Sequence, residues 1–129
     1  MSRSQAVALL WLRVLMGGGM AFHGSQIIFG GRIAQFTEAV FKLGFPIPEV
    51  FAWAAALSEF LGGILIVLGL ETRIAACWVF ITMSVAVFKQ HAHDPFHVKE
   101  LALTYWTMAG TLIVAGGGPY GIAGLFKRK

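Results

Sequence analysis

Few side chains in this chain could do chemistry, and most of them are set in otherwise apolar sequence. Arg13, His23 and Glu59 each stand within a long apolar stretch. A second group follows the third such stretch: Lys89, His91, His93, Asp94, His97 and Glu100. Carboxylates and histidines enclosed among apolar side chains are suited to taking up and releasing protons. The pattern therefore favours a proton-handling site inside an apolar protein.

Glu59 lies near the middle of residues 51–70 and is the only ionisable side chain in that stretch. About 20 apolar residues form a helix long enough to cross a bilayer, and a carboxylate at its centre costs on the order of 3 kcal/mol on insertion scales. Small residues stand one turn away on either side: Ala55, Ala56, Gly62 and Gly63. Because small residues let another helix approach closely, we expect Glu59 to face protein and not lipid.

The composition is that of a membrane protein. The 129 residues are 57% hydrophobic and 12% charged, against about 25% charged residues in soluble domains. The net charge of +4 does not indicate nucleic-acid binding, because Lys127, Arg128 and Lys129 directly follow an apolar segment, where they would anchor the chain to anionic headgroups. The single cysteine, Cys77, excludes disulfides within the chain and cysteine-cluster metal sites.

Four apolar stretches predict transmembrane helices at about residues 6–29, 51–70, 73–90 and 100–116. Between the first two, Ile33, Phe36, Val40 and Leu43 recur at helical spacing, which predicts a short amphipathic helix in the membrane interface. The expected fold is all-α: one domain over residues 1–129, a transmembrane four-helix bundle with this interfacial helix between helices one and two.

The distribution of lysine and arginine predicts the orientation. With both termini cytoplasmic in an inner membrane, five of these residues lie inside (Arg3, Arg73, Lys127, Arg128 and Lys129) and four lie outside (Arg32, Lys42, Lys89 and Lys99). In that arrangement Arg13 and Glu59 differ in depth by about 5 Å at 1.5 Å per residue. We therefore expect an Arg13–Glu59 ion pair, which either belongs to a functional site or only fixes helix register.

The remaining polar residues gather toward the predicted outer side. His23, Lys89 and Glu100 are expected to line a cavity with Glu59, and a threonine stripe on Glu100's face would extend into it: Thr104, Thr107 and Thr111. His91, His93 and His97 are also candidate metal ligands, because imidazole suits zinc, copper or iron. Their spacing matches no zinc signature, so proton transfer or hydrogen bonding to a quinone is the competing interpretation.

Several features, in order along the chain, resemble the DoxX family of small four-helix membrane proteins. They are Arg13, His23-Gly24, Glu59 followed by Gly62-Gly63, Gly69-Leu70 with Thr72-Arg73, a histidine after the third helix, and Glu100. The resemblance covers nearly the whole chain. It implies a membrane-embedded oxidoreductase component, linked in some members to sulfur-compound oxidation and the quinone pool.

Three functional interpretations follow. In the first, a quinone enters past Trp53 and Tyr105, with Arg13 and Gly24 at the binding site, His23, Lys89 and Glu100 as hydrogen-bond partners, and Glu59 as proton carrier. In the second, the chain anchors a redox partner subunit, which fits the absence of any dinucleotide, haem or iron–sulfur motif. In the third, a homo-oligomer transports protons, metal or another solute.

Overall fold

The computed structural model describes residues 1–127 and, within them, is helical without strands. The elements are α1 (Arg3–Phe29), α2 (Ile33–Lys42), α3 (Pro48–Leu68), α4 (Thr72–Val85), a π-helical turn η1 (Ala86–Gln90), α5 (Phe96–Ala115) and α6 (Ile122–Lys127). The all-α prediction is confirmed, and each predicted span coincides with a helix, the third being α4 continued by η1.

Local sequence explains where the helices begin and end. Ser2 caps α1 by accepting a hydrogen bond from the Gln5 N–H, while the Gln5 side chain accepts one from the Ser2 N–H. Pro48 occupies the first turn of α3, where its missing N–H costs nothing. Gly69 ends α3 with a φ of 71°, a left-handed conformation that glycine adopts without a Cβ penalty.

The closest helix pair is α1 with α3, and glycines make it possible. A Cβ on Gly63 would lie 2.5 Å from the Ala21 backbone nitrogen and 2.6 Å from the Gly17 oxygen. A Cβ on Gly24 would lie 2.5 Å from the Phe60 nitrogen. The two backbones therefore touch at two levels, as small residues at a membrane helix interface allow.

The other helix pairs combine apolar packing with hydroxyl bridges. The hydroxyls of Ser58 on α3 and Thr82 on α4 are 2.7 Å apart. Trp106 of α5 donates its indole N–H to the Ser84 hydroxyl of α4 at 3.0 Å and stacks on Phe80. Helix α4 therefore packs between α3 and α5. A core rich in methionine and alanine runs along the helices.

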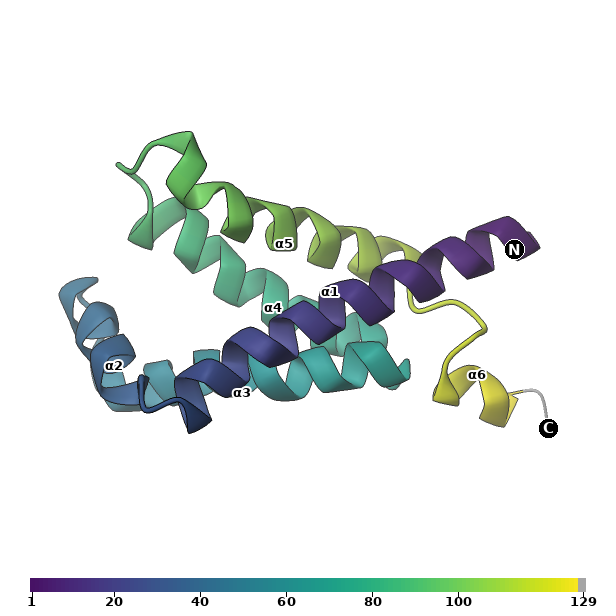
Figure 1. Ribbon diagram of the computed structural model, residues 1–129, viewed down its shortest axis with the longest axis horizontal. Helices are drawn as coiled ribbons and strands as arrows, with labels where there is room; N and C mark the ends of the chain where they lie inside the picture. The colour runs from purple at the N-terminus through teal and green to yellow at the C-terminus, as the bar shows by residue number, and fades with distance from the viewer. Residues whose placement is uncertain (128–129) are drawn as a thin grey trace.

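The helices run back and forth between two ends of the molecule (Figure 1). One end carries the start of α1, the α3–α4 turn, the end of α5, and α6; the other carries α2 and the α4–α5 connection. The start of α1 and helix α6 thus lie at the same end of the molecule.

Three stretches of helix in the described chain are long and apolar enough to cross a membrane: Arg3–Phe29, Pro48–Leu68 and Thr72–Gln90. Helix α5 is 20 residues long but is not one of them. Its first turns carry Lys99 and Glu100, and three threonines follow, which lowers its apolar character. The chain is therefore an all-helical protein with three candidate spans, and α5 is a more polar helix packed beside them.

Candidate functional site

Glu59 is buried in the middle of α3, with 7% of its surface exposed. Within residues 1–127 its carboxylate has no hydrogen bond and no ion pair, and its Oε2 atom is fully enclosed without a partner. Buried polar atoms are almost always hydrogen-bonded, and an unpaired buried carboxylate costs several kcal/mol. Glu59 is thus a costly residue for which packing gives no explanation.

Tyr105 of α5 lies within electrostatic range of Glu59. Its ring meets that of His23 on α1 edge to face, with centroids 5.9 Å apart and planes at 83°. Glu59, Tyr105 and His23, here called the central triad, therefore bring together three helices that are distant in sequence. None of the three side chains makes a hydrogen bond to the described part of the chain.

Two glycines of α1 make room for the triad. The Tyr105 hydroxyl lies against Gly19, where a Cβ would overlap it. Gly24, next to His23, lies on the backbone of Phe60, next to Glu59. Gly24 was predicted to belong to the site, and it holds α1 and α3 together beside the triad. Gly19 was not predicted; the run Gly17-Gly18-Gly19 was the signal that could have found it.

The predicted Arg13–Glu59 ion pair is wrong. Arg13 is fully buried, but it donates from Nη1 to the carbonyls of Ile66 and Val67 at 3.4 Å each, and from Nη2 to the Tyr120 carbonyl at 2.7 Å. The residues whose carbonyls it reaches on α3 lie seven and eight positions after Glu59, about 10 Å farther along the helix. The carbonyls at the end of α3 attract a cation, and a comparison of side-chain depths alone does not take them into account.

Arg13 joins three segments at that end of the molecule. Glycines surround its guanidinium: Gly69 at the end of α3, Gly117 after α5 and Gly121 before α6. A Cβ on Gly121 would lie 2.9 Å from Nη1, and one on Gly69 would overlap that atom. Arg13 therefore closes the end of α3 and holds the chain between α5 and α6 against it, which is a structural role.

Lys89 and Glu100 lie apart from the central triad. Lys89 is exposed in η1, with Nζ 5.0 Å from the centroid of the Phe45 ring, and Glu100 is exposed on α5. The prediction that a stripe of threonines lines a cavity is also wrong. All three threonines are exposed, and each donates its hydroxyl to a carbonyl of its own helix: Thr104 to Glu100, Thr107 to Leu103 and Thr111 to Thr107.

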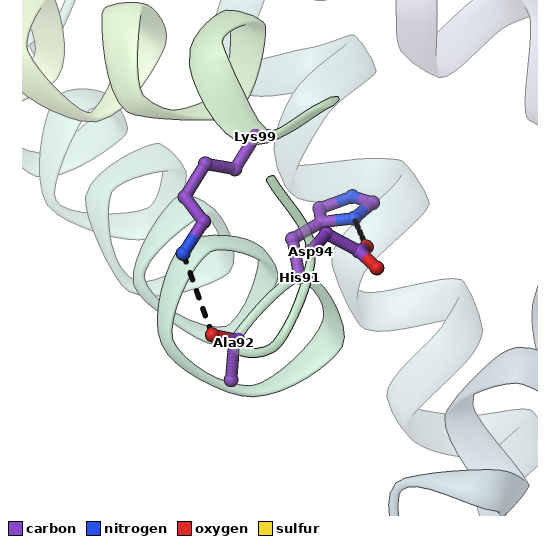
Figure 2. A network of polar contacts seen from close by, with 4 residues as sticks. All are labelled: His91, Ala92, Asp94 and Lys99. Carbon is purple, nitrogen blue, oxygen red and sulfur yellow. Dashed lines mark hydrogen bonds and ion pairs between the residues drawn. The ribbon is translucent and has the colours of Figure 1, made fainter. Parts of the chain in front are cut away.

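The histidine-rich connection between α4 and α5 forms its own polar network (Figure 2). Nδ1 of His91 is 2.8 Å from Oδ2 of Asp94, and Lys99 donates to the Ala92 carbonyl at 3.4 Å. His93 and His97 are exposed. Across residues 1–127, no three histidine, cysteine or acidic side chains lie together as a metal-binding group, so the geometry does not bring His91, His93 and His97 into one site.

The tryptophans do not surround the triad. Trp53 on α3 and Trp78 on α4 are exposed, while Trp106 packs against Phe80 and Phe88 between α4 and α5. Of the two aromatic residues predicted to admit an apolar ring, Trp53 and Tyr105, Tyr105 is the one with a ring contact to His23.

Comparisons with known proteins agree with the sequence resemblance. Searches of curated proteins and of solved structures found no match. Residues 8–92 match the DoxX family, a stretch that begins before Arg13, contains His23 and Glu59, and ends after His91. Since these residues are well over half of the chain, it belongs to the DoxX family.

Proposed function

We propose that this protein is a quinone-linked oxidoreductase component of a membrane, in which the central triad binds the quinone head and carries protons. The observation that supports the proposal is the triad itself. The buried Glu59 and the half-buried His23 and Tyr105 come from three helices, and none makes a hydrogen bond within the described chain. Such groups are suited to a small ligand that supplies the missing partners.

The triad fits a quinone in its chemistry. The Tyr105 hydroxyl and a ring N–H of His23 can donate to quinone carbonyls, and the Glu59 carboxyl can take up or release a proton. A quinone supplies the two-electron, two-proton chemistry that the side chains of this chain lack. The polypeptide's contribution is to place the three groups together and to exclude bulk water with the surrounding apolar helices.

The same proposal includes a position in the inner membrane. Helices α1, α3, α4 with η1, and α5 would cross it as a four-helix bundle, with α2 in the outer interface and both termini cytoplasmic. Helix α5 crosses in this arrangement because it is 20 residues long and packs its apolar residues on α4. Placing Glu59 near mid-depth keeps the triad away from both surfaces.

The test begins with protein purified in mild detergent. Co-extracted lipids are assayed for quinone, and a short-chain quinone is then titrated while intrinsic tryptophan fluorescence is followed. The reduced quinol is titrated in the same way, and we expect Glu59→Gln to weaken its binding by about tenfold, the cost of the charge-assisted hydrogen bond that the Glu59 carboxylate accepts from a quinol hydroxyl. Glu49→Gln is the matched control, because Glu49 is an exposed glutamate in the first turn of the same helix.

Three outcomes would overturn the proposal: no quinone in the extract together with no saturable binding, equal loss in both variants, or binding that is unaffected by Glu59→Gln. If quinone is absent and a stoichiometric partner co-purifies instead, the chain is an anchor for a redox enzyme. If proteoliposomes show solute flux that Glu59→Gln abolishes, it is a transporter.

A further inference from the structure

A cavity with a few polar side chains lies at the opposite end of the molecule from α2. Its volume is about 800 Å³, and it is lined by Met1, the α3–α4 turn, the first residues of α4 and the loop after α5. The cavity does not include any member of the central triad. Two walls of it are fixed, because Arg13 holds the end of α3 and the Tyr120 carbonyl together.

The start of α4 opens into this cavity. Glu71, which precedes the helix, has a φ of 46°, and no side chain caps the helix. The first three residues of α4, Thr72, Arg73 and Ile74, all line the cavity. The first N–H groups of a helix lack intrahelical acceptors and carry partial positive charge, which favours an anion there.

Thr72 gives an independent indication of a ligand. Its side chain is 7% exposed, and its hydroxyl makes no hydrogen bond to any residue from 1 to 127. The hydroxyl points at Gly117, which lines the same cavity, and a Cβ on that glycine would lie 2.6 Å from it. A hydroxyl that has no partner in the described chain, on a residue that is 7% exposed and lines the cavity, is a donor available to an acceptor that enters there.

Arg73 supplies the positive charge. It has no ion pair within the described chain, and its guanidinium lies along the loop after α5, where a Cβ on Gly116 would be 3.0 Å from Nε and 3.2 Å from Nη2. Met1 lines the same cavity. One carboxylate, Glu71, also lines it and opposes an anion.

We propose that this cavity binds a phosphate group, held by the Arg73 guanidinium, the Thr72 hydroxyl and the free N–H groups at the start of α4. Guanidinium and phosphate form paired, charge-assisted hydrogen bonds. The same group is offered by the headgroup of an anionic phospholipid and by free phosphate. The site is separate from the triad and does not depend on the proposed quinone chemistry.

The test uses the full-length protein in neutral detergent, with phosphatidylglycerol, phosphatidylcholine and inorganic phosphate as probes. Bound lipid is counted by native mass spectrometry, and phosphate binding is followed by the shift in unfolding temperature. We expect Arg73→Gln to weaken binding about tenfold and Thr72→Val about threefold. Arg32→Gln, the same change at an exposed arginine at the other end of the molecule, should leave binding unchanged.

Glu71→Gln removes the carboxylate that opposes an anion and should tighten binding by a few fold. Misfolding would weaken binding, so it cannot account for this result. Preference for phosphatidylglycerol over phosphatidylcholine, without competition from inorganic phosphate, identifies a lipid headgroup as the source. Saturable binding of inorganic phosphate that Arg73→Gln weakens identifies a soluble phosphate. The proposal is overturned if neither probe binds above the phosphatidylcholine level, or if Arg32→Gln and Arg73→Gln lose equally.

Discussion

Two ionisable residues are buried along the same helix pair, Arg13 on α1 and Glu59 on α3, and they differ in the hydrogen bonds that the rest of the chain offers them. Arg13 donates to three backbone carbonyls and is enclosed by glycines. Glu59 has no hydrogen bond in the described chain, and one of its oxygens is sealed away from solvent. Both are expensive to bury, and Arg13 also keeps one buried donor, Nε, without a partner in the described chain. Its Nη1 and Nη2 atoms are nevertheless satisfied by backbone carbonyls, whereas the Glu59 carboxylate has no hydrogen-bond partner there.

Whether a buried polar side chain has hydrogen-bond partners in the fold helps to distinguish a structural role from a functional one. A buried charge that the backbone satisfies stabilises the arrangement of the chain around it, and removing it should unfold the protein. A buried polar group left without partners lowers stability, so it persists when another role maintains it. We therefore expect Arg13 to have a structural role and Glu59 to have a functional role.

The largest effect on stability is expected from Arg13→Met. The substitution removes three hydrogen bonds from a charged donor and releases the loop before α6, so the free energy of unfolding should fall by about 3 kcal/mol. Thermal or denaturant unfolding in detergent measures it. Arg3→Met is the control, because Arg3 is exposed in the first turn of the same helix. Equal stability of the two variants would show that the buried contacts of Arg13 contribute nothing.

The contact between α1 and α3 is tested by Gly63→Ala. The new Cβ would lie within 2.6 Å of backbone atoms of Ala21 and Gly17, which cannot rotate away, so we expect a loss of about 1–3 kcal/mol from overpacking. Gly18→Ala makes the same change at an exposed position with nothing within 4 Å. That control should be neutral or stabilising by up to about 1 kcal/mol. A neutral Gly63→Ala would mean that the two helices are farther apart than described.

Tyr105→Phe should change stability by less than about 0.5 kcal/mol, because the hydroxyl makes no hydrogen bond in the described chain. Quinone affinity should fall by a few fold, since a donor is lost from the triad. Fluorescence titration measures the affinity, and Tyr120→Phe, at a residue between α5 and α6 that is not part of the triad, should leave it unchanged. A large loss of stability with unchanged affinity would make Tyr105 a packing residue.

Sequence patterns predicted the helices and the burial of Glu59 well, because both depend on local composition. Long apolar runs fix where helices form, and glycines one turn from Glu59 indicate a packed face. Gly62 and Gly63 are indeed buried beside it. The convergence of His23 and Tyr105 depends on how α1 and α5 approach each other in space.

The hydrogen-bond partners of the polar side chains could not be predicted from composition in the same way. Opposite charges suggested that Arg13 pairs with Glu59, but backbone carbonyls have no sequence signature, and those of Ile66, Val67 and Tyr120 are the actual acceptors. The threonines of α5 were misassigned for a related reason. A helical hydroxyl can be satisfied by its own helix, so a polar stripe need not face a cavity.

The most direct test of the contrast is Glu59→Gln, assayed for stability and for quinone binding on the same preparation. The amide keeps the shape of the side chain and removes the charge whose burial nothing in the described chain offsets. We expect the unfolding temperature to stay the same or rise while affinity for the quinol, whose hydroxyl can donate to the Glu59 carboxylate, falls by about tenfold. A lower unfolding temperature with unchanged affinity per folded molecule would show that Glu59 is structural, like Arg13, and would contradict the account.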